Sequence, residues 1–99
     1  MTPYCTSDFE LEFPELDFDL VDKIVLTIKQ GDVKLERTEE SMTVSGHVIA
    51  LSLTQQDTRA FAPGYAELQV NFLLTTGKRI SSDIATVNVD RNLHMEVMT

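Results

Sequence analysis

The chain has no tryptophan and a single cysteine, Cys5. One thiol cannot form an intrachain disulfide, so a small fold stapled by disulfides is excluded. The lack of a Cys pair and of Trp also argues against an antibody-type immunoglobulin domain, whose core holds both. A reactive thiol needs an activating partner such as His. His47 and His94 lie far from Cys5 in the sequence, so we expect no catalytic role for this cysteine.

Basic residues are also scarce. The chain has 8 Lys and Arg residues and 16 Asp and Glu residues, so its net charge is -8. Nucleic-acid phosphates and anionic membranes are bound by Lys/Arg surfaces, so neither is an expected partner. This charge favours solubility or a basic partner. Seven acidic residues precede the first basic residue, Lys23. We interpret this acidic region as a solvated strand face followed by an acidic loop. These acidic residues are Asp8, Glu10, Glu12, Glu15, Asp17, Asp19 and Asp22.

Long apolar runs are missing as well. No run approaches the roughly 18 residues that a membrane-spanning helix needs. The first residues also lack the basic and apolar segments of a signal peptide. A chain of 99 residues with 42% hydrophobic residues predicts one domain, residues 1–99, with a modest core. Within it we distinguish a polar lead segment, residues 1–7, and a tail, residues 91–99.

Apolar and polar residues alternate along most of the chain, as is typical of half-buried strands. Phe9, Leu11 and Phe13 alternate with acidic residues, and Pro14 ends that run. The connector 15–22 is expected to hold a short helical turn over one end of the core. Further strands are predicted at 23–30, 32–38, 42–44, 47–53, 65–74 and 79–90.

Glycine-containing turns separate several of these runs. The turn at Gly31 predicts a β-hairpin between 23–30 and 32–38. The turn at Gly77 predicts a second hairpin with left-handed backbone at that glycine. In 79–90 the isoleucines and valines have opposite parity, which predicts a β-bulge near Ala85 and Thr86. About seven short antiparallel strands with one short helical turn predict an all-β, immunoglobulin-like β-sandwich.

The helical turn is predicted at the centre of the chain, between 47–53 and 65–74. Thr54 is placed to cap its N-terminus by accepting a backbone hydrogen bond. Asp57 stands three residues later, close to the spacing of a capping box. Phe61 is expected to plug the end of the sandwich. This segment therefore predicts a structural crossover between the two sheets.

Candidate chemical groups are few and unspecific. Glu10 and Glu12 share a strand face, where two exposed carboxylates are expected rather than an acid/base pair. The Asp17, Asp19 and Asp22 spacing resembles the start of a calcium loop but lacks the central Gly and the distant Glu. His47 and His94 form no metal set with one thiol.

Three further polar groups complete this search. Ser82 has no G-x-S-x-G frame, so a hydrolase nucleophile is unsupported. Gln69 and Asn71 share the polar face of a strand and are expected to face solvent. No catalytic residue, metal or cofactor is predicted, and the chain is expected not to be an enzyme.

The pattern Leu-Thr-Gln-x-acid-Thr-x-x-Phe at residues 53–61 carries a family resemblance. Together with other short segments in the same order, it resembles small proteins encoded by bacteriophages and prophages of Gram-positive bacteria. The arrangement is similar to the N-terminal β-sandwich of phage baseplate upper proteins, a family that anchors receptor-binding proteins to the tail tip. The accompanying segments are Thr2-Pro3, 9–14, 24–30, Gln69-Val70, Thr76-Gly77 and 82–84.

The resemblance implies a virion structural protein, made in the host cytoplasm and acting by assembly with other virion proteins or with itself. Its place would be a tail, a baseplate or a capsid. Unpaired strand edges and terminal segments are the expected contact surfaces. The alternative hypothesis is an acidic phage inhibitor of a host protein that mimics nucleic acid. The candidate docking residues are Phe9, Leu11, Phe13, Leu93, Met95 and Val97.

Overall fold

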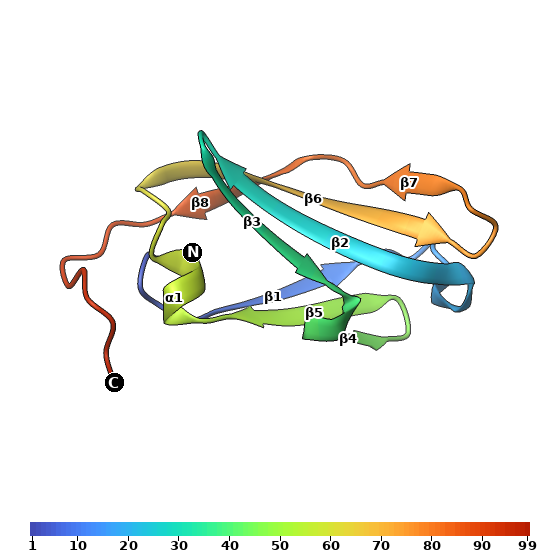
Figure 1. The fold of residues 1–99 in the computed structure, drawn as a ribbon, viewed down its shortest axis with the longest axis horizontal. Helices are drawn as coiled ribbons and strands as arrows, with labels where there is room; N and C mark the ends of the chain where they lie inside the picture. Colours follow the sequence, from blue (N-terminus) through green and yellow to red (C-terminus); the bar gives the residue numbers. More distant parts are fainter.

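In the computed structural model, which describes residues 1–99, eight strands form two antiparallel sheets packed face to face (Figure 1). The predicted all-β sandwich is confirmed, with eight strands in place of about seven. The smaller sheet has the order β1-β5-β4, formed by β1 (Ser7–Glu12), β4 (Met42–Ser45) and β5 (Val48–Leu53). The larger sheet contains β2 (Val21–Gln30), β3 (Val33–Thr38), β6 (Gly64–Leu74), β7 (Arg79–Ser81) and β8 (Ala85–Val89).

The core lies between the sheets and follows the predicted alternation. Each long strand buries every second residue, because successive side chains point to opposite faces of a sheet. Phe61, from the crossover, and Val89, from β8, complete the buried cluster. The strand residues that form most of it are Ile24, Leu26 and Ile28 of β2, Ile49, Leu51 and Leu53 of β5, and Ala66, Leu68, Val70 and Phe72 of β6.

The predicted hairpin at Gly31 is confirmed. Gln30 pairs with Val33, so two residues form the turn between β2 and β3. Gly31 has a φ of 56°, a conformation that glycine adopts without steric cost. A glycine at the first central position is typical of the type II′ hairpin turn. Gly77 also has a positive φ, of 88°, as predicted for the second hairpin.

The predicted bulge near Ala85 and Thr86 is wrong, because β8 pairs regularly with β6 from Ala85 to Val89. The change of parity comes instead from an interruption of the strand at residues 82–84. Ser81 pairs with Asn71 and Ala85 with Leu68, so three residues of one strand stand opposite two of β6. Ser82 is the cause, because its hydroxyl oxygen accepts a hydrogen bond from the Val70 backbone N–H at 2.9 Å. A side chain thus replaces a backbone acceptor, and the edge strand is divided into β7 and β8.

The two short 3-10 helices lie in connections. η1 (Phe18–Leu20) is the helical turn expected between β1 and β2. The Phe18 and Phe13 rings both make edge contacts with Phe72, with centroids 6.1 and 5.1 Å away, so η1 covers one end of the core. η2 (Glu39–Ser41) connects β3 to β4. None of the helical segments is long or apolar enough to cross a bilayer.

Candidate functional site

The crossover from β5 to β6 holds the predicted helical turn, α1 (Gln55–Thr58). The Thr54 hydroxyl accepts from the Asp57 N–H at 3.2 Å, and the Asp57 carboxylate accepts from the Thr54 N–H at 2.9 Å. Two backbone donors without intrahelical partners are thereby satisfied, which completes a capping box. The predicted roles of Thr54 and Asp57 are confirmed.

Replacing Thr54 by Ala is expected to lower the free energy of unfolding by about 1 kcal/mol, because the cap hydrogen bond to Asp57 is lost. Denaturant titration of the purified variant measures this loss. Thr75→Ala, in the exposed turn before Gly77, is the matched control and should be near neutral. Equal stability of wild type and Thr54→Ala would show that the cap contributes nothing.

Asp57 also forms an ion pair with Arg37 of β3, which ties α1 to the larger sheet. Burial by itself raises the pKa of the Asp57 carboxyl. The hydrogen bonds from Thr54 and the Arg37 guanidinium outweigh this effect, so the pKa lies below its ordinary value. A carboxylate predicted only as a cap is therefore also a charged link between the crossover and the sheet.

Phe61 closes the end of the sandwich where α1 lies. Its side chain is 2% exposed and is among the largest fully buried side chains. The predicted plug is thus confirmed. The following residue, Ala62, exchanges two backbone hydrogen bonds with the Gln30 side chain, at 2.8 and 2.7 Å. The end of the β2–β3 hairpin is therefore fixed beside this plug.

The lead segment is held against the same end by bonds that sequence analysis did not predict. Thr58, fully buried, donates its hydroxyl hydrogen to the Cys5 carbonyl at 2.8 Å. The Met1 carbonyl accepts from the Asp90 N–H at 2.7 Å, and the Met1 amino group donates to the Asn88 carbonyl at 2.8 Å. Residues 1–5 thus cover part of the β8 edge and are occupied with contacts inside the chain.

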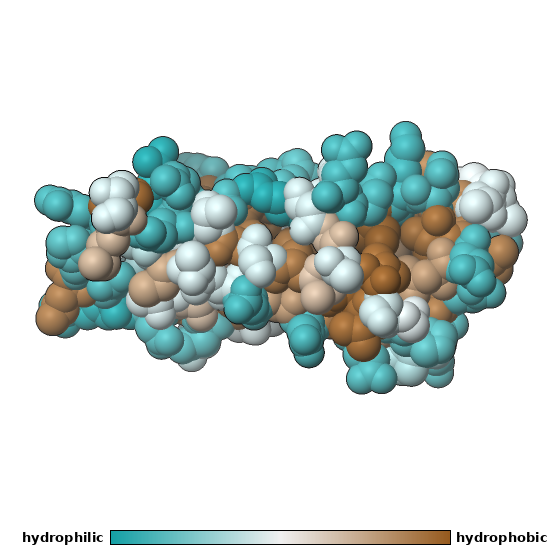
Figure 2. All heavy atoms as spheres, turned by 90° about the horizontal axis from the view of Figure 1, so that it is seen from below, coloured by the Kyte–Doolittle hydropathy of each residue, from teal (hydrophilic) through white to brown (hydrophobic).

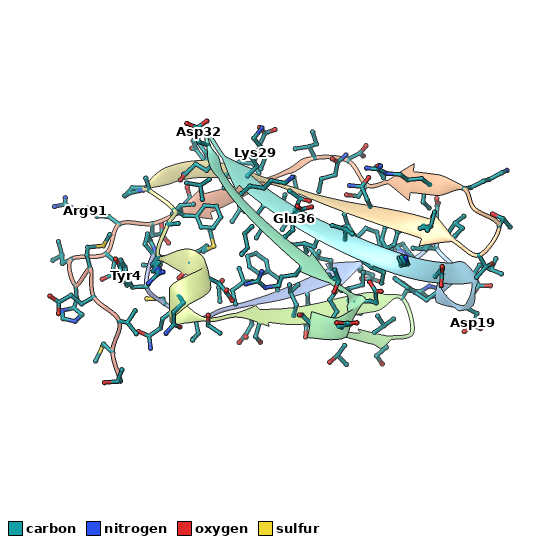
Figure 3. The ribbon with its side chains drawn as sticks, viewed as in Figure 1. Tyr4, Asp19, Lys29, Asp32, Glu36 and Arg91 are labelled. Atoms are coloured by element: carbon teal, nitrogen blue, oxygen red, sulfur yellow. The ribbon has the colours of Figure 1, made fainter.

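The tail, residues 91–99, runs outside both sheets (Figure 1). It leaves the sandwich at Arg91, at the end where Tyr4 also lies (Figure 3). The Gln55 side chain holds it with two hydrogen bonds to the Met98 backbone, at 2.8 and 2.7 Å. Of the predicted docking residues here, Leu93 is 86% exposed, Met95 47% exposed and Val97 half-buried. The tail thus carries alternating apolar residues and pairs with no strand of either sheet.

The three docking residues predicted near the N-terminus are Phe9 and Leu11 of β1 and Phe13 directly after it, and all three lie on the inner side of the smaller sheet. Phe9, Leu11 and Phe13 are half-buried and pack against the core cluster, because the alternation that makes β1 a strand points them inward. Asp8, Glu10 and Glu12 face outward and are exposed. β1 pairs with β5 alone. It therefore offers a partner one free backbone edge and an acidic face.

An apolar hollow of about 530 Å³ lies beside the end of β1, and its apolar lining residues are Phe13, Leu16, Phe72 and Ile80. Ile80 pairs with buried Phe72 and so faces inward, yet it is 40% exposed. The reason is that the three-stranded sheet does not cover β7. Figure 2 shows exposed hydrophobic residues gathered toward this end of the molecule.

The remaining chemical candidates are not brought together. No group of three or more His, Cys, Asp or Glu side chains is placed to hold a metal ion. Asp17 accepts from the Asp19 N–H at 3.0 Å and so caps η1. His47 contacts the Leu16 carbonyl at 2.9 Å. Gln69 donates to the Ser82 carbonyl at 3.1 Å, so these side chains hold connections and edge strands.

A second hollow, on the outer face of the larger sheet, was not predicted. We call it the basic hollow. It has a volume of about 620 Å³ and contains four of the 8 basic residues of the chain, Lys23, Lys29, Lys34 and Arg79. The only acidic residues lining it are Glu36 and Glu67. The sequence signal is weak, since each lysine appears as one polar position in an alternating strand.

Comparison of the chain with protein-family models, with curated proteins and with solved structures found no match.

Proposed function

We propose that this protein is a non-enzymatic structural component of a bacteriophage virion, which assembles on a tail, baseplate or capsid by protein–protein contact. The observation that carries the proposal is the free edge of β1 beside the uncovered apolar hollow. The resemblance of residues 53–61 and the other short segments to phage proteins supports the virion as the place of assembly.

A strand edge with free N–H and C=O groups can pair with a strand of another chain. Such pairing at β1 would also cover Ile80 and Phe13, because the added strand would extend the three-stranded sheet over β7. The free edge and the exposed apolar residues thus favour the same kind of partner. The tail, with Leu93 and Met95 exposed, supplies a second apolar contact segment.

Ile80→Asp is expected to abolish incorporation into particles, because a charge would enter the apolar contact. The measurement is quantitative mass spectrometry of purified virions, in which the wild-type protein should be present in many copies. Tyr65→Asp is the matched control, since Tyr65 is 72% exposed and lies away from the hollow. Thermal unfolding establishes that both variants are folded. Absence of the wild-type protein from particles, or normal incorporation of Ile80→Asp, would contradict the proposal.

A further inference from the structure

We propose that the basic hollow binds the acidic face of β1 of a second copy, so that copies of this chain join head to tail. This inference rests on the proposed assembly role and names one partner for it. It concerns the outer faces of the two sheets and not the β1 edge. The two faces lie on opposite sides of the sandwich, so one copy cannot join them within itself.

The floor of the basic hollow comes from alternate residues of β2 and β6, and side chains of β3 and β7 border it. The half-buried side chains Val25 and Leu73 form an apolar floor, and Gln69 and Asn71 add amide groups. Lys23 and Lys29 stand at positions six residues apart on β2, which corresponds to about 20 Å along a strand. The hollow thus has an elongated shape that suits an extended segment.

Four basic and two acidic side chains line the basic hollow, which leaves it a net charge of +2 (4 − 2). The chain has two ion pairs, and only Lys34–Glu36, at 3.2 Å, lies in this region. Lys29 stands opposite Lys34 of β3 and opposite Glu67 of β6 in the register, so it has one like charge and one opposite charge as cross-strand neighbours. The Arg79 guanidinium donates to the Asn71 side-chain oxygen at 3.3 and 3.2 Å, which orients the cation without neutralising it. An anionic partner would complement the net positive charge of this lining.

The acidic face of β1 has the complementary charge. Asp8, Glu10 and Glu12 are exposed on one side of the strand, and no basic side chain pairs with any of them. Successive carboxylates are about 7 Å apart along the strand, so the row is about 14 Å long. Long lysine side chains at both ends of the basic hollow can reach such a row.

A contact between two different faces of the same chain is heterologous, so it repeats and produces rings or open filaments. Opposite charges select this register and orientation of the copies. The contact leaves the free edge of β1 and the apolar hollow available to other virion proteins. Self-association and docking to a different partner can therefore occur together.

The experiment uses two variants of the full chain in which charged residues are neutralised, Lys23→Gln/Lys29→Gln and Glu10→Gln/Glu12→Gln. Their association is measured by sedimentation velocity at protein concentrations up to about 1 mM, where weak contacts are populated. Wild type is expected to form a concentration-dependent series of oligomers. Each variant alone should associate at least tenfold more weakly. An equimolar mixture should form a 1:1 dimer and nothing larger, because only one intact contact can form. Lys78→Gln/Arg91→Gln removes two positive charges outside the hollow and should behave as wild type.

Three results would overturn the inference: monomeric wild type, unchanged association of Lys23→Gln/Lys29→Gln, or no dimer in the mixture. Monomeric wild type that binds polyglutamate would assign the basic hollow to another acidic partner. The proposed function is judged separately from particle composition. A protein that is monomeric but present in virions would contradict this inference alone. A protein that oligomerises but is absent from virions would contradict the proposed function alone.

Discussion

Phe61→Ala is expected to lower the free energy of unfolding by about 3–5 kcal/mol, the largest loss that we predict for a single substitution. The ring is 2% exposed and belongs to the buried core cluster. Its removal forfeits apolar burial and leaves a cavity at the end of the sandwich. The position is also fixed from two sides, by α1 and by the Gln30 contacts with Ala62, so the chain cannot collapse easily into the space.

The measurement is chemical denaturation of wild type and variant, with Phe18→Ala as the control for the same chemical change. Phe18 is half-buried and packs on the edge of Phe72, so its truncation leaves a site open to solvent. We expect a smaller loss there. Domains of this size have about 5–15 kcal/mol of stability in total, and Phe61→Ala should therefore unfold readily on heating. If Phe61→Ala lowered the free energy of unfolding by less than Phe18→Ala does, the role of Phe61 as the plug of the sandwich end would be contradicted.

The strands and the crossover could be predicted from the sequence because they depend on neighbouring residues. In β2, β5 and β6 one set of alternate residues is apolar, and this period fixes both the strand and its buried face. The cap at Thr54 is equally local, since its partner Asp57 is three residues away. The interruption between β7 and β8 also has a local signal, the change of parity between Ile80 and Val87, although that signal by itself predicts a bulge near Ala85 and Thr86.

The assembly of the sheets could not be predicted in the same way. Lys23 and Arg79 both lie beside Leu73 in neighbouring strands, although they are far apart in the sequence. Each appears as an ordinary solvated position until the strand order is known. The basic hollow is therefore a product of topology. The ion pair between Arg37 and Asp57 was missed for the same reason.

The docking residues show what alternation can and cannot decide. Phe9, Leu11 and Phe13 are predicted as contact residues because they belong to a terminal segment of the chain. β1 is an edge strand, but the pattern that makes it amphipathic also directs these side chains into the core. In the tail, Leu93 has no sheet to face and remains exposed. The same sequence period thus leads to burial in one segment and exposure in the other.

Asp57→Asn is expected to lower the free energy of unfolding at pH 7 by about 2 kcal/mol, because hydrogen bonds to a charged group contribute about 1.5–3 kcal/mol. Asp57 accepts from the Thr54 N–H and pairs with Arg37. The variant retains the shape of the side chain and removes its charge. Denaturant titrations at pH values from 7 to 2 measure the loss and its pH dependence.

The sign of the pH effect follows from the lowered pKa of Asp57. Burial opposes ionisation of this carboxyl, but the Thr54 and Arg37 contacts prevail. The folded state therefore favours the charged form, and its contribution is complete above the ordinary value of 3.8 and is lost as pH falls through the lower folded value. The difference between wild type and Asp57→Asn should shrink as pH falls below about 4.

Asp32→Asn is the matched control, because Asp32 lies exposed at the tip of the β2–β3 hairpin (Figure 3). It removes one charge without touching the capping box, so its curve should follow that of wild type. A difference between wild type and Asp57→Asn that stayed constant with pH would show that the carboxylate charge is not what stabilises the crossover. Acid sensitivity that persists in Asp57→Asn is expected from Glu39, whose pKa is lowered chiefly by the hydrogen bond from the Ile24 N–H. Glu39→Gln in the same background should remove that part.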